Sequence, residues 1–166
     1  MEHKFVRTSA REMALQSLFQ LDVDKAVLED LVNRLPDKVN EFGPAITVTE
    51  ALAAVKEEHE EEKREQAFAY AQELVEGVLS RQEELDALIN KYSVKWSVER
   101  MPLADKLILR IAAYELFYAQ DKVEAGIAIN EAVEMGKAYG TDESSRFING
   151  LLGQMVRSNA EGISRD

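Results

Sequence analysis

Apolar residues occupy nearly every face of the helix that the sequence predicts at residues 104–118. At 3.6 residues per turn, only Asp105, Lys106, Arg110 and Glu115 interrupt the apolar faces. A helix on the protein surface needs a continuous polar face, and this one lacks it. We therefore predict that it is buried among other helices, with its charged side chains paired or directed through gaps.

A second core helix is predicted at residues 67–79, where apolar residues recur at three- and four-residue spacing. Ser80 followed by Glu83 has the spacing of a capping box, which predicts that Ser80 begins the next helix. Trp96 lies in the connection after that helix, where a lone tryptophan is more often a core residue than a binding residue. Pro102 then favours a start of the central helix at its first turn.

The first helix of the chain is predicted from a capping box of Ser9 and Glu12. This pattern places the helix start near Ala10, and the apolar stripe ends near Asp22 or Asp24. The residues before the helix are then a short basic and aromatic segment.

Residues 26–35 favour a short helix that Pro36 ends, and residues 37–46 are typical of a loop. A capping box at Thr47 opens a weakly amphipathic helix, which runs into the acidic stretch at residues 57–65. We interpret that stretch as a solvated face or an exposed helical extension.

Two more helices are predicted in the last third of the chain. The first opens at Ile127, and its small residues Ala128, Ala132 and Gly136 lie four apart, so a neighbouring helix can approach closely. Gly140 is expected to end this helix in the left-handed conformation.

Thr141 or Asp142 is expected to cap the final helix, and the polar tail at residues 158–166 is expected to fray. No segment has the pattern of a strand. The sequence therefore predicts an all-α fold, a compact bundle of about seven helices.

Composition narrows the possible functions. The 166 residues carry a net charge of −11, which argues against nonspecific nucleic-acid binding by the whole surface. Any nucleic-acid role then needs a local basic patch or a basic partner. The absence of cysteine is consistent with a cytoplasmic protein, no signal peptide is expected, and Arg110 breaks the longest apolar run, which argues against a membrane span.

Residue types typical of catalysis are scarce. The two histidines do not form a triad pattern, and residue 56 is Lys where a di-iron bundle needs Glu three before His59. The eight glycines form no phosphate-binding loop. We therefore expect a binding module with no catalytic residues, no metal and no cofactor.

Four blocks resemble the NusB family of bacterial transcription antitermination factors. They are AREMALQSLFQLD (10–22), ADKLILRIAAYEL (104–116), AINEAVEMGKAYGTDES (128–144) and RFINGLL (146–152). The resemblance implies one helical domain over residues 1–166. Its N-terminal lobe would cover about 1–80 with an acidic insertion at about 36–62, and its C-terminal lobe about 81–157. It also implies binding of boxA RNA in ribosomal RNA leader transcripts together with NusE, a ribosomal small-subunit protein.

Arg7 and Arg11 flank the predicted helix start, where positive charge opposes the helix dipole. That mismatch favours a functional role, although solvated surface arginines remain an equal alternative. In the family an arginine-rich N-terminal segment contacts RNA, and these two residues match its positions. Thr8 and Ser9 stand where many relatives have arginine, which implies a weaker contribution from this segment.

The resemblance places further residues near RNA. Aromatic rings at Tyr139 and Phe147 match family positions where bases would stack, although for Phe147 a core role is at least as expected. The complete set of candidate RNA-binding residues is Lys4, Arg7, Arg11, Lys137, Tyr139, Thr141, Ser144, Arg146 and Phe147, and the candidate partner-binding residues are Arg100 and Asp105.

Two other functions stay open. A similar helical domain precedes the catalytic domain of ribosomal RNA cytosine methyltransferases, so the chain is alternatively an RNA-binding accessory module of that kind. It is otherwise a scaffold that binds only proteins. The resemblance also implies contact with the transcription elongation complex and a possible homodimer through the RNA-binding face.

Overall fold

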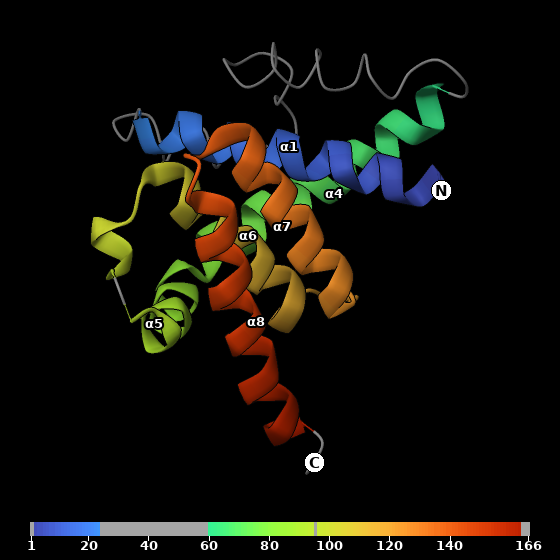
Figure 1. Ribbon diagram of the computed structural model, residues 1–166. Coiled ribbons are helices and arrows are strands. Elements are labelled where there is room, and N and C mark those ends of the chain that lie inside the picture. Colours follow the sequence, from blue (N-terminus) through green and yellow to red (C-terminus); the bar gives the residue numbers. More distant parts are fainter. Residues whose placement is uncertain (1, 24–59, 95, 164–166) are drawn as a thin grey trace. The chain divides into compact units, whose positions relative to one another are not determined.

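The computed structural model describes residues 2–23, 60–94 and 96–163, and these residues form helices and connections without a strand. The helices are α1 (Glu2–Val23), α4 (Glu60–Ser80), α5 (Gln82–Tyr92), the short 3-10 helix η3 (Val98–Arg100), α6 (Leu103–Phe117), α7 (Ala125–Tyr139) and α8 (Ser144–Ile163) (Figure 1). The predicted all-α fold is confirmed. The expected helix at 26–35, the loop at 37–46, the capping box at Thr47 and most of the insertion lie outside the described residues.

The chain divides into two compact units, Met1–Glu76 and Gly77–Asp166. The division falls within α4, close to the lobe boundary expected near residue 80. The assembly of the two lobes into one domain stays a prediction. Within the described residues, none of the helices combines the length and the apolar character needed to cross a membrane.

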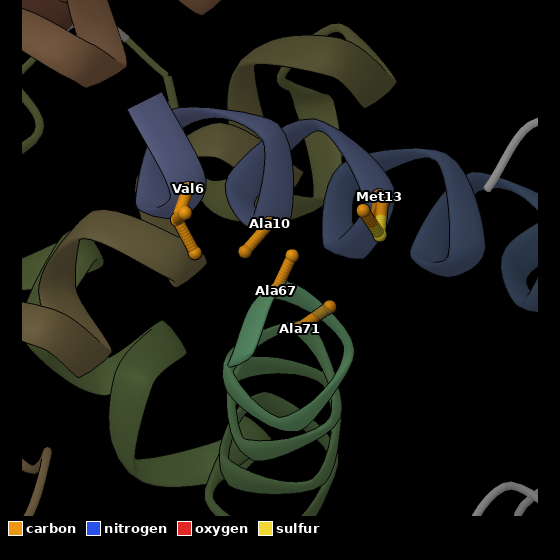
Figure 2. Close-up of a cluster of buried hydrophobic side chains, with 5 residues drawn as sticks. All are labelled: Val6, Ala10, Met13, Ala67 and Ala71. Atoms are coloured by element: carbon orange, nitrogen blue, oxygen red, sulfur yellow. The ribbon is translucent and has the colours of Figure 1, made fainter. Parts of the chain in front are cut away.

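In the first unit, α1 and α4 pack through small side chains. Figure 2 shows Ala10 of α1 pointing toward Ala67 of α4. Both alanines are completely buried, and their small size lets the two helix backbones approach closely. The full cluster consists of Val6, Ala10, Met13, Ala67 and Ala71, with the partly buried Phe68 and Tyr70 packed against it.

The start of α1 corrects the sequence-based prediction. The helix begins at Glu2, and Ser9 is a buried residue inside it. The reason is that Val6 extends the apolar stripe of Ala10 by one turn, and burial of that stripe outweighs the local capping signal. Arg7 therefore lies beyond the first turn, where the helix dipole has little effect, so the dipole argument for a functional role was wrong.

The second unit is built around α6, as predicted. Every residue of α6 from Ala104 to Leu116 is buried except Lys106. Two of its charged side chains have partners on other helices. Arg110 donates two hydrogen bonds to Asp86 of α5, at 2.8 and 3.0 Å. Asp105 accepts a hydrogen bond from Ser144 of α8.

The remaining helices of this unit surround α6. The helix packs against α5, α7 and α8, and α7 runs side by side with α8 (orange and red in Figure 1). The close approach predicted for the small-residue face of α7 is confirmed at Gly136. A Cβ atom on Gly136 would lie 2.9 Å from the Ile148 Cδ1 atom and 3.4 Å from the Ser145 Cα atom of α8.

Three predicted helix boundaries near α4, α6 and α7 were misplaced. Ser80 ends α4, where its hydroxyl donates to the Gly77 carbonyl at 3.2 Å, and Arg81 is the N-cap of α5. Pro102 is the N-cap of α6 rather than its first residue. Helix α7 begins at Ala125, two residues before Ile127.

The end of the chain also differs from the prediction. Gly140 has φ −100° and ψ −165°, an extended conformation rather than a left-handed one. Neither Thr141 nor Asp142 is the N-cap of α8. The Glu143 carbonyl instead accepts the hydrogen bond from the Phe147 N–H, and the helix starts at Ser144. The tail expected to fray from residue 158 is helical to Ile163.

Candidate functional site

A pocket of about 300 Å³ opens in the second unit between the connection before α6 and the start of α8. It lies where three parts of the chain meet: the segment around Trp96, the first turn of α6, and the turn that joins α7 to α8. The lining residues are Trp96, Pro102, Asp105, Thr141, Glu143, Ser144, Arg146 and Phe147. The pocket thus brings together Thr141, Ser144, Arg146 and Phe147 from the predicted RNA-binding set.

Buried polar residues hold one wall of this pocket in place. The Ser144 hydroxyl donates to the Asp105 carboxylate at 2.6 Å and accepts from the Thr141 backbone N–H at 2.9 Å. The Thr141 hydroxyl lies 3.2 Å from the same Ser144 oxygen. Since the Ser144 hydroxyl both donates and accepts a hydrogen bond, it fixes the turn before α8 to the core helix.

The extended Gly140 is part of the same arrangement. A Cβ atom on Gly140 would collide with the Ser144 side chain and lie 2.8 Å from the Gly136 carbonyl oxygen. Glycine is therefore required here by close approach, whereas its freedom to adopt a positive φ plays no role.

Asp105 is only 2% exposed, which leaves little of its carboxylate surface for the contact with a partner protein that the resemblance implied. Burial raises the pKa of Asp105, and the hydrogen bond from Ser144 opposes this by lowering the pKa. A carboxyl group with a raised pKa in the folded state favours folding most below its unfolded pKa, near 3.8. That contribution is lost as pH rises through the folded-state value.

We expect Asp105→Asn to remove this pH dependence. Compared with the variant, the wild type should lose free energy of unfolding as the pH rises above about 3.8, because only the wild type must ionise a buried carboxyl group. Urea denaturation of both proteins at a series of pH values measures this difference in the free energy of unfolding. A difference that rises with pH instead would mean that the folded state stabilises the carboxylate.

Two aromatic rings also line the pocket. The centroids of Trp96 and Phe147 lie 5.2 Å apart at an interplanar angle of 66°, an edge-to-face contact. The Ser93 hydroxyl donates to the Trp96 carbonyl, and the Val98 N–H donates to Asn90 at 2.8 Å. These bonds fix the connection that carries Trp96. Both rings are half-buried, so each is neither fully enclosed in the core nor fully solvated.

The rim of the pocket carries opposite charges. Arg146 and Glu143 are both exposed, and each contributes to the lining. An arginine beside aromatic rings suits a nucleotide, because guanidinium groups bind phosphate while rings stack on bases. Glu143 would repel the same phosphate.

The other predicted residues of the second unit are not in the pocket lining. Lys137 is exposed on α7 and pairs with Glu134 at 3.3 Å. Tyr139 is half-buried at the end of α7, and Arg100 is exposed in η3.

A separate group of cationic side chains lies in the first unit. The Arg7 guanidinium lies 4.6 Å from the centroid of the Tyr70 ring, and that of Arg11 lies 5.8 Å from it. Arg7 is half-exposed, whereas Arg11 is 2% exposed. Of the two, only Arg7 presents its charge to solvent, and Lys4 lies in the first turns of α1.

Sequence reasoning missed three residues of these groups. Tyr70 belonged to a predicted apolar stripe, Trp96 was interpreted as a core residue, and Glu143 received no role. One feature of the sequence could have indicated the contact of Tyr70. Its helix face also carries alanines, and their small side chains leave room for another chain segment to reach the ring. In the part of the chain that the structure describes, histidines and carboxylates do not gather into a group that would hold a metal ion.

Comparison with known proteins supports the family resemblance of the four sequence blocks. The NusB family model matches residues 8–157. The transcription antitermination protein NusB of Bacillus subtilis is 37% identical over 155 residues, which cover 93% of this chain and 97% of that protein. The NusB protein of Bdellovibrio bacteriovorus is 40% identical over 153 residues, covering 92% and 96%.

Solved structures agree in fold. T. maritima NusB superposes with a TM-score of 0.61 at 26% identity, covering 91% of this chain and 90% of that one. A NusB crystallised with NusE and double-stranded RNA superposes with a TM-score of 0.62 at 21% identity, covering 92% and 97%. Both matches extend over most of each chain, as does the family model. This chain therefore belongs to the NusB family.

Proposed function

We propose that this protein is a transcription antitermination factor that binds boxA RNA of ribosomal RNA leader transcripts together with NusE. The observation that carries the proposal is the pocket in which Arg146 adjoins the Trp96 and Phe147 rings. Its relatives are named transcription antitermination proteins, and one NusB was crystallised with NusE and RNA.

The charge of the chain explains why a partner is needed. With a net charge of −11, the protein attracts RNA only where cations are concentrated. Arg7 over Tyr70 and Arg146 beside the pocket are two such places, and a basic ribosomal protein would extend the positive surface. Lys137 and Tyr139 are further proposed RNA contacts in the second unit, and the exposed Arg100 stays a proposed contact to the partner.

The proposed mechanism is recruitment. The protein and NusE hold nascent RNA to the transcription elongation complex in the cytoplasm, and no bond is made or broken, so the protein is not an enzyme. Asp105 acts as a positioning residue, because its carboxylate holds Ser144 rather than a ligand. Association into a homodimer would compete with RNA if it used the same face.

We expect Arg7→Ala to weaken binding of a boxA-type RNA in the presence of NusE. The slope of log K against log salt should become shallower by about one unit, because one phosphate contact is lost. Fluorescence anisotropy of a labelled RNA across a salt series measures both quantities. Lys122→Ala is the matched control, since it removes one exposed positive charge in the α6–α7 connection.

Equal losses in the two variants would contradict a specific role for Arg7. Binding of NusE without any binding of RNA would favour the protein scaffold. Binding of RNA that NusE does not enhance would favour the accessory module related to methyltransferases.

A further inference from the structure

We propose that the pocket beside Trp96 receives one unpaired base of the bound RNA, and that Trp96 is a base-contacting residue. This inference deepens the proposed function and rests on it. It assigns a ligand-contacting role to a residue that the sequence suggested was part of the core.

The geometry of the aromatic pair supports a stacking role. In an edge-to-face pair, the ring that offers its edge keeps both of its own faces clear of the other ring. The 66° interplanar angle shows that the Trp96 and Phe147 rings are not stacked face to face on each other. Both rings line the same pocket, and its volume of about 300 Å³ is at the small end of ligand sites, which suits one base.

The polar side of the pocket supports the same ligand. A base has apolar faces and an edge of donors and acceptors, so its site needs both kinds of surface. Thr141 and Glu143 supply polar groups to the same pocket as the rings, and the exposed Arg146 supplies a cation for the adjoining phosphate.

Two polar residues of the pocket lining are held rigidly. Ser144 and Asp105 are almost completely buried and hydrogen-bonded to each other, so this part of the lining is formed before a ligand arrives. A preformed site avoids the entropic cost of ordering its side chains on binding.

The experiment uses the fact that Trp96 is the one tryptophan of the chain. Intrinsic tryptophan fluorescence is titrated with boxA-type RNA and NusE, and anisotropy of labelled RNA is followed in parallel. The Trp96→Phe variant supplies the signal of any other fluorophore for subtraction. We expect the Trp96 emission to be quenched with the same midpoint as the anisotropy change.

A second arm replaces each nucleotide of the RNA in turn by an abasic one. Loss of one stacked base should weaken wild-type binding by about 5- to 150-fold, from about 1 to 3 kcal/mol per base. Trp96→Leu should weaken binding of intact RNA similarly, and should show no further loss with the abasic RNA at that one position. Val94→Ala is the control in the same connection, because Val94 is 96% exposed and lies outside the pocket lining.

Unchanged Trp96 emission while the anisotropy rises would overturn the inference and leave the proposed function intact. Additive losses at every abasic position would overturn it as well, since they would show that Trp96 acts only on the fold. No anisotropy change, even with NusE present, would overturn the proposed function and the inference together.

Discussion

Replacing Asp86 by alanine is expected to lower the free energy of unfolding by about 2 to 3 kcal/mol. The carboxylate binds the guanidinium of Arg110 through two parallel hydrogen bonds, and Arg110 is buried on the core helix. Without Asp86, this positive charge stays in the core without its bidentate acceptor. The loss lies toward the low end for a buried pair because the Asp86 side chain is 26% exposed, so water reaches the site.

Urea denaturation of the wild type and the variant gives the two free energies directly. The control is Glu84→Ala on the same helix. Glu84 pairs with Arg81 at 3.2 Å, but both side chains are exposed, so its loss should change stability by less than about 1 kcal/mol. Similar losses in the two variants would contradict the special role of the Asp86–Arg110 pair.

Replacing Gly77 by alanine is expected to lower the free energy of unfolding by about 2 kcal/mol or more. A Cβ atom at this position would overlap the Tyr114 ring, with the Cδ1 atom at 2.8 Å and two other ring atoms nearer still. Tyr114 is buried on α6, so its ring has little room to move. Overpacking of this kind outweighs the gain of about 1 kcal/mol that alanine brings over glycine in a helix.

Gly150→Ala is the matched control, because a Cβ atom on Gly150 in α8 would meet no heavy atom within 4 Å. Only the helix-propensity gain remains there, so this variant should be more stable by about 0.5 to 1 kcal/mol. Thermal unfolding of both variants tests the pair. An unchanged or raised midpoint for Gly77→Ala would show that Tyr114 can move aside.

Periodicity predicted the helices that are buried on several sides. The central helix was identified because its apolar residues cover every face, and burial is the one environment that tolerates such a surface. Capping signals were weaker guides. Ser9 and Ser80 both had the right spacing for an N-cap, yet Ser9 lies inside α1 and Ser80 ends α4. A cap contributes about 1 kcal/mol, which packing of an adjoining apolar turn can exceed.

The partners of the buried charges were not predictable from the sequence. Arg110 and Asp86 are 24 residues apart, and Ser144 and Asp105 are 39 apart. Pairing over such separations depends on how whole helices cross, and no local pattern encodes it. Five residues of the pocket lining, including Asp105, were named from the family resemblance, whereas the role proposed for Trp96 needed the positions of three chain segments in space.

The bond between Asp105 and Ser144 has a consequence for how this protein can evolve. Asp105 belongs to the core helix, and its carboxylate holds the turn that forms one pocket wall. A change elsewhere in α6 that shifts the helix along its axis therefore reshapes the pocket without altering any lining residue. For the ligand binding proposed here, natural selection would act on interior positions too, and inherited loss of binding could arise from mutations far from the surface.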